Sequence, residues 1–151
     1  MAIRNALLAR IRYYREVVGL PTVLYAATGR ITVRTSPQLG AIGVPGVLGG
    51  QVAARLDYWH GVLVPVVMHP ATGRRIFLVR NDIDDRTGVQ EWLHPVNGDV
   101  LDTDVEVALP SPALGVERWT WVDWPQDAYL PSGADVLAAI GDCAGLAVAG
   151  V

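Results

Sequence analysis

The sequence predicts an α+β domain: a largely antiparallel or mixed sheet of about five to seven strands, with helices at the N-terminus, in the middle and at the C-terminus. Apolar residues recur at helical spacing in those three places. The remaining apolar runs are short, rich in β-branched residues and bounded by turn residues. With 151 residues, 51% hydrophobic and 18% charged, the chain fits one folded domain (residues 1–151) and not an intrinsically disordered protein.

The first helix is predicted over residues 2–18. Its apolar face comprises Ile3, Leu7, Ile11, Tyr14 and Val18. Gly19 follows at the position where helices commonly end.

An internal repeat comes next, because residues 21–30 and 65–74 are identical at six of ten positions. Each copy places Ala-Thr-Gly-Arg between two β-rich runs, which predicts hairpins over residues 21–34 and 65–80. Gly29 and Gly73 supply the positive φ that a tight hairpin turn needs.

The rest of the chain supplies further strands and helices. Strands are predicted over 41–44, 105–109 and 118–122, helices over 47–59 and 88–94, and a last helix with the apolar stripe Val136, Leu137, Ile140 and Cys143. Ser132 with Asp135 three residues later resembles a capping box for the last helix, and Gly145 ends that helix.

Charge is unevenly distributed along the sequence. All 12 basic residues are arginine; residues 1–80 hold ten of them against two acidic residues (+8), and residues 81–151 hold two against thirteen (−11), which gives the net charge of −3. This asymmetry indicates either a polyanionic partner for the basic half or two halves that neutralise each other within one fold.

Arginines on the two hairpins and on one flank of the first helix are the candidate nucleic-acid-binding residues. They are Arg4, Arg12, Arg15, Arg30, Arg34, Arg74, Arg75 and Arg80. If they meet on one surface, they form a basic patch able to contact phosphates. The five tryptophans would stack on bases if they were exposed.

Two acidic clusters are the candidate divalent-cation ligands. Their members are Asp82, Asp84, Asp102 and Asp104. Carboxylate oxygens suit the cations used in phosphoryl transfer. The alternative is that both clusters are solvated turns, since asparagine, glycine and threonine flank them.

Several common chemistries lack their sequence signals. One cysteine, Cys143, excludes a disulfide framework and a cysteine-based zinc site, and its place on an apolar helical stripe indicates packing. The sequence contains no nucleophile elbow, P-loop or dinucleotide-binding fingerprint, and the three histidines have no metal-ligand spacing. No cofactor and no catalytic residue are therefore predicted.

The sequence has no clean apolar leader and no membrane-spanning segment, so a cytoplasmic protein with no membrane partner is expected.

The order of segments within residues 62–142 resembles the N-terminal domain of bifunctional DNA primase/polymerases, and small actinobacterial proteins of unassigned function that are similar to it. The resemblance is carried by the hairpin at 65–79, Val107-Ala-Leu-Pro-Ser-Pro, Gly115-Val-Glu-Arg-Trp-Thr-Trp, and Leu130-Pro-Ser before a closing helix. That family implies an Asp-x-Asp strand before the hairpin and a histidine on its second arm. Here no such strand precedes the hairpin, and Ile76 or Phe77 stands in place of the histidine. The resemblance thus implies a related fold without the metal-dependent active site.

Three functions follow from these observations. The first is a non-catalytic domain that acts through a protein or self-association interface, in which the basic half of one copy faces the acidic half of another. The second is a nucleic-acid-binding module derived from a primase-like fold. The third is a divalent-cation-dependent phosphoryl-transfer enzyme using the aspartates above.

Overall fold

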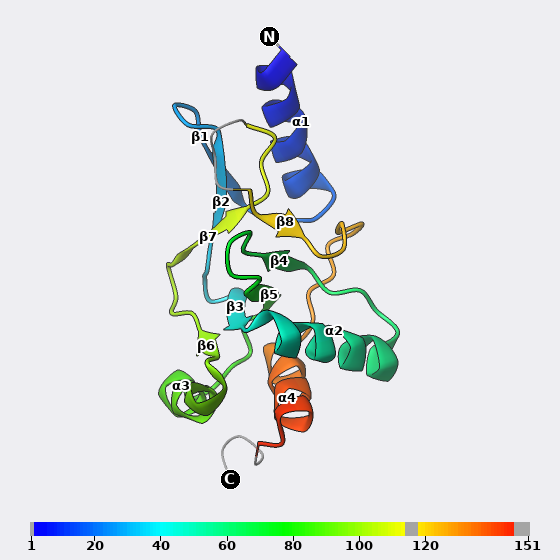
Figure 1. Cartoon of the computed structure of the whole chain (residues 1–151). Coiled ribbons are helices and arrows are strands. Elements are labelled where there is room, and N and C mark those ends of the chain that lie inside the picture. Colours follow the sequence, from blue (N-terminus) through cyan, green and yellow to red (C-terminus); the bar gives the residue numbers. More distant parts are fainter. Residues whose placement is uncertain (1, 114–117, 147–151) are drawn as a thin grey trace.

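The computed structural model describes residues 2–113 and 118–146 and has an α+β fold (Figure 1). The helices are α1 (Ala2–Glu16), α2 (Gly46–His60), α3 (Arg86–Leu93), the 3₁₀ helix η1 (His94–Val96) and α4 (Gly133–Ala144). The strands are β1 (Thr22–Tyr25), β2 (Arg30–Arg34), β3 (Leu39–Val44), β4 (Val66–Met68), β5 (Arg75–Arg80), β6 (Asp99–Val100), β7 (Glu106–Leu109) and β8 (Thr120–Trp121).

A five-stranded antiparallel sheet in the order β6-β3-β5-β4-β8 forms the centre of the molecule. Strands β3 and β5 pair along their whole length, from Leu39 opposite Arg80 to Val44 opposite Arg75. Every residue of β3 is buried, so both faces of this sheet are covered.

Helices cover one face of the five-stranded sheet. Ile42 and Phe77, which lie opposite each other on β3 and β5, point into this core. Val52 of α2 and Ile140 of α4 pack against them, and all four side chains are fully buried. In Figure 1, α2 and α4 accordingly lie together on one side of the strands.

The opposite face packs against a second, three-stranded antiparallel sheet in the order β1-β2-β7 and against α1. Ala41 and Leu78 of the large sheet share this core with Ile31 of β2 and Tyr14 of α1. Because side chains alternate between faces along a strand, neighbouring residues of β3 and β5 supply two separate cores.

The two predicted hairpins are present as β1–β2 and β4–β5, and Gly29 and Gly73 have φ values of +79° and +73°. They belong to different sheets, whereas the sequence predicted one sheet of about five to seven strands. The chain leaves the small sheet after β2 and enters the large sheet at β3, and β7 later returns to pair with β2. Local turn chemistry predicts a hairpin but carries no information about which sheet it joins.

Smaller differences concern short elements. The strand predicted over 118–122 is only Thr120–Trp121 among the described residues, and β6 lies in a segment interpreted as an acidic turn. The cap of α4 is as predicted, with Ser132 Oγ accepting a hydrogen bond from the Asp135 amide. Within the described ranges, no helix is long and apolar enough to cross a membrane.

The side chain of Tyr14 ties α1 to the rest of the fold. Its hydroxyl donates to the Pro110 carbonyl oxygen at 2.5 Å and accepts from the Trp121 indole nitrogen at 3.1 Å. Its ring is fully buried and packs edge-on against Trp121. Burial raises the pKa of Tyr14, so the neutral hydroxyl is the form that holds these contacts.

We expect Tyr14→Phe to lower the free energy of unfolding by about 1–3 kcal/mol, because it leaves the partly buried Trp121 indole N–H without this acceptor and leaves the Pro110 carbonyl oxygen only the hydrogen bond from Arg10. Urea denaturation measures the loss. Tyr58→Phe is the control, since Tyr58 is 85% exposed and its substitution should change stability by less than about 0.5 kcal/mol. Equal losses in the two variants would contradict the role assigned to the hydroxyl.

Candidate functional site

The three candidate arginines of the first helix lie on the exposed side of α1. Arg15 donates to the Thr22 carbonyl oxygen at 2.7 Å. Arg4 and Arg12 make no hydrogen bond or ion pair with any residue that the structure describes.

Arg30 and Arg34 project from β2 toward Glu106 on β7. Arg34 lies 3.0 Å and Arg30 3.6 Å from the Glu106 carboxylate, and Arg34 also reaches Asp104 at 3.5 Å. The Tyr25 hydroxyl donates to the same glutamate. This part of the small sheet therefore carries balanced charge and is not a basic patch.

The arginines of the second hairpin likewise contact other residues of the same chain. Arg74 binds the Asp99 carboxylate at 2.5 Å and the Asn97 carbonyl oxygen at 2.8 Å. Arg80 donates to the Leu130 carbonyl oxygen at 3.3 Å. The stem of Arg75 packs beneath α2 so closely that a Cβ on Gly49 would lie 2.8 Å from its Cδ.

The eight arginines are thus distributed over α1, the small sheet and the large sheet, and five of them donate to carboxylates or backbone carbonyls. Most ion pairs join a basic residue of the first half of the chain to an acidic residue of the second half. Examples are Arg34–Glu106, Arg74–Asp99 and Arg55–Asp142. The opposite charges of the two halves meet within one fold, which supports the second of the two interpretations of the charge asymmetry.

The candidate metal ligands do not converge. Asp82 accepts hydrogen bonds from Ser132 Oγ at 2.5 Å and from the Ala134 amide at 3.1 Å, at the start of α4. Asp102 faces Arg86 at 3.4 Å, Asp104 faces Arg34, and Asp84 is exposed. Within residues 2–113 and 118–146, no group of three or more histidine, cysteine or acidic side chains could hold a metal ion.

The other residues singled out in the sequence have structural surroundings. His69 Nδ1 accepts hydrogen bonds from the amides of Ala71 and Thr72 in its hairpin turn. Cys143 is partly buried and packs against the helix-side core, as its place on the apolar stripe indicates. Among the tryptophans, Trp59 and Trp124 are exposed, at 41% and 40%.

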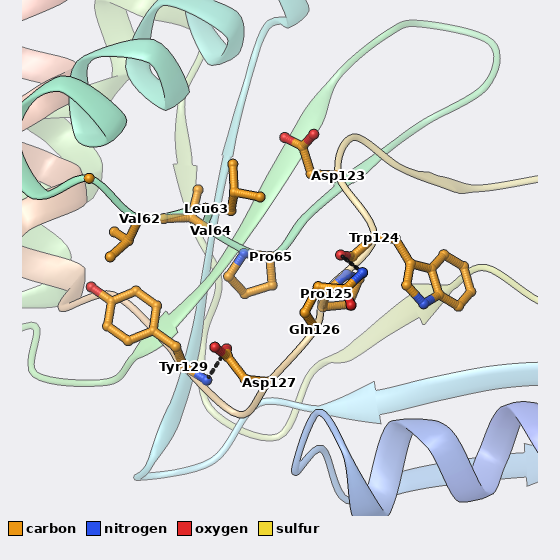
Figure 2. Close-up of a pocket in the computed structure, with 11 residues that line it drawn as sticks. Val62, Leu63, Val64, Pro65, Asp123, Trp124, Pro125, Gln126, Asp127 and Tyr129 are labelled. Carbon is orange, nitrogen blue, oxygen red and sulfur yellow. Dashed lines mark hydrogen bonds between the residues drawn. The ribbon is translucent and has the colours of Figure 1, made fainter.

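Trp124 forms part of a groove of about 270 Å³ between two segments that are far apart in the sequence (Figure 2). One wall is the segment Gly61–Pro65, which connects α2 to β4. The other wall is formed by residues 123–127 and Tyr129, after β8. We call this the acidic groove.

Local chemistry explains the first wall of the acidic groove. Gly61 has φ +64° and its amide donates to the Asp57 carbonyl oxygen, so α2 ends there in a left-handed residue. The following residues run toward β4, and Leu63 is left 62% exposed at the rim of the groove.

The second wall is held in place by α1. The Tyr13 hydroxyl donates to the Pro125 carbonyl oxygen at 2.5 Å, and the Arg10 guanidinium lies 4.8 Å from the centre of the Trp124 ring. Two further hydrogen bonds shape the segment, one from the Tyr129 amide to Asp127 at 3.0 Å and one from the Gln126 side chain to the Trp124 carbonyl oxygen at 3.3 Å (dashed in Figure 2).

The acidic groove is negative and partly apolar. Asp123 and Asp127 are its charged lining residues, both are exposed, and no arginine or histidine of the described ranges lines it. The C-terminal end of α2, which ends beside the groove, adds the partial negative charge of its free carbonyl groups. Tyr129, 40% exposed, contributes aromatic surface, and the Trp124 indole, also 40% exposed, points away from the Gly61–Pro65 wall toward Tyr13 and Arg10 (Figure 2).

The size of the groove limits what it can hold. Pockets for small molecules usually span about 300–1,000 Å³ and bury most of the ligand. At about 270 Å³ and open to solvent, this groove suits a few protruding side chains of a larger partner. Its chemistry favours side chains that combine positive charge with apolar surface.

Sequence patterns did not identify this groove. Trp124 is one of five tryptophans with no local pattern to distinguish it, and Asp123 and Asp127 belong to no motif. The one local signal is the density of aromatic, proline and acidic residues in residues 123–129, Asp-Trp-Pro-Gln-Asp-Ala-Tyr.

Comparison of the chain with protein-family models, with curated proteins and with solved structures finds no match. The resemblance to primase/polymerase N-terminal domains therefore stays a prediction from the sequence.

The surroundings of Asp82 make a pH-dependent contribution to stability. Partial burial raises the pKa of this carboxyl, but the hydrogen bonds from Ser132 and from backbone amides at the start of α4 outweigh that effect, and the pKa lies below its ordinary value. A lowered pKa in the folded state means that the ionised carboxylate stabilises the fold above the unfolded pKa, and that this stabilisation is lost as the pH falls through the folded pKa.

We therefore expect Asp82→Asn to lower the melting temperature at pH 7, with a deficit that shrinks below about pH 4. Thermal unfolding from pH 7 to pH 3 measures the difference. Asp84→Asn, at an exposed neighbouring carboxylate, should show no such pH-dependent difference. A deficit for Asp82→Asn that is constant with pH would show that the charge of the carboxylate is irrelevant.

Proposed function

We propose that this chain is a protein-interaction domain that binds a basic, partly apolar protein segment in the acidic groove. The proposal is carried by two exposed carboxylates, Asp123 and Asp127, together with exposed Leu63, Trp124 and Tyr129. No basic side chain is among the described residues that line the groove. Exposed apolar surface of this kind is typical of binding sites, and aromatic residues are enriched at protein interfaces.

The rigid placement of the groove also supports an interface. The Trp124 segment is held by Tyr13 and Arg10 of α1, so the surface is already formed before a partner binds. Binding therefore costs little conformational entropy in this segment. A cytoplasmic location and the absence of catalysis remain predictions from the sequence.

The two alternative functions have weaker support. A nucleic-acid-binding surface needs unpaired cations, and five of the eight candidate arginines are bound to carboxylates or carbonyls of the protein. A cation-dependent enzyme needs converging ligands, and the candidate aspartates face Ser132, Arg86 and Arg34 instead. Neither alternative has an observation of its own that favours it.

A peptide titration tests the proposal. The probe is a fluorescein-labelled helical peptide of alanine, leucine and arginine. The control is a peptide of the same design that carries glutamate in place of each arginine. Fluorescence anisotropy should show binding of the arginine peptide alone, and this binding should weaken at high salt because the contacts are exposed to solvent.

The variant Asp123→Asn/Asp127→Asn should weaken this binding by about three- to tenfold, in keeping with the modest strength of exposed ion pairs. Its control is Asp84→Asn/Glu91→Gln, which changes the net charge equally at exposed positions outside the groove. Equal weakening by both variants would mean that net charge, and not the groove, binds the peptide. No binding of the arginine peptide at low salt would reject the proposed function.

A further inference from the structure

We propose that the acidic groove receives the first half of helix α1 from a second copy of this chain, so that two copies exchange these helices reciprocally. This inference rests on the proposed function of the groove and names its partner.

The first half of α1 is mostly exposed in its own chain. Residues 2–6 are all exposed, Leu7 is half-buried against the core beside the small sheet, and the first buried residue of the helix is Ile11. Two large apolar side chains of this half, Ile3 and Leu8, are 45% and 49% exposed. In Figure 1 this end of α1 extends beyond the two sheets. Because isolated helices of this length are marginal in water, an apolar, projecting helix end indicates a contact that the single chain does not supply.

The charges of this helix end complement those of the groove. α1 carries four arginines against the single acidic residue Glu16, and no acidic residue lies in its first turn. Arg4 of this half and Arg12 of the second half make no ion pair with any described residue, and the groove residues Asp123 and Asp127 carry the opposite charge. The free amides of the first turn add partial positive charge at the end of the helix that would meet these carboxylates.

A chain cannot place this helix end in its own groove. The second half of α1 is already fixed against the groove wall, through Tyr13 on Pro125 and Arg10 on Trp124. From there the helix extends away, and at 1.5 Å per residue Arg4 lies about 14 Å beyond Tyr13 along its axis. The same distance allows two antiparallel α1 helices to lie side by side, each with its first half at the Trp124 segment of the other copy. Such an exchange is closed and two-fold symmetric, the commonest arrangement of protein oligomers.

Charge reversal tests this inference on the full-length chain. In analytical ultracentrifugation the unaltered protein should form a species of twice 16.2 kDa as its concentration rises. The helix variant Arg4→Glu places an acidic side chain of the first half of α1 opposite an acidic groove. The groove variant Asp123→Arg/Asp127→Arg places basic side chains opposite a basic helix. Each alone should raise the dissociation constant of the pair by at least about tenfold.

An equimolar mixture of the two variants should restore the pair, because each helix then faces a groove of opposite charge. Circular dichroism checks that both variants fold. The controls are Arg118→Glu for the helix variant and Asp84→Arg/Glu91→Arg for the groove variant, all at exposed positions outside α1 and outside the groove lining. Neither control should dissociate the pair.

The outcomes separate this inference from the proposed function. A chain that stays monomeric but binds the arginine peptide in the groove overturns the inference and leaves the proposed function standing. A monomeric chain that binds no peptide removes both. A dimer that neither variant weakens, or a mixture that fails to restore the pair, shows that the copies meet through another surface and also overturns the inference.

Discussion

The pairing of β3 with β5 is the constraint on which the rest of the structure depends. Every residue of β3 is buried, and side chains such as Phe77 and Leu78 of β5 enter cores on opposite faces. A sheet buried on both sides needs two covering layers. The helices α2 and α4 supply one, and the small sheet with α1 supplies the other. The acidic groove follows from this arrangement, since one wall continues from α2 and the other leads from β8 toward α4.

Folding largely cancels the charge asymmetry of the sequence. Arginines from the first half of the chain, such as Arg34 and Arg74, meet carboxylates from the second half across and beside the strands. The charges left without such partners are therefore informative. Among the described residues, they include Arg4 and Arg12 of α1 and the aspartates of the acidic groove. These two sets have opposite sign, and each lies beside exposed apolar side chains, which is the combination that an interface between copies requires.

The fold was predicted from the sequence where short-range chemistry decides it. Helical spacing located α1, α2 and α4, and the turn glycines Gly29 and Gly73 located both hairpins. The division into two sheets was not predicted, because it depends on β7 pairing with β2 across more than seventy residues.

The candidate site was not predicted from the sequence for the same reason. Its walls come from residues 61–65 and 123–129, and neither segment has a periodic pattern that indicates a neighbour. The opposite charges of the two halves were visible from the start, but their pairing inside one fold was one of two open interpretations.

Hydrogen–deuterium exchange of the full chain at low and high protein concentration tests most directly the claim that the acidic groove and the first half of α1 bind each other between copies. Amides of residues 2–9, 61–65 and 123–129 should exchange more slowly at high concentration, because helix fraying and solvent access decrease when the copies pair. The rest of the chain should exchange at similar rates under both conditions. Exchange that is independent of concentration in these three segments, or slowing confined to another surface, would contradict the account.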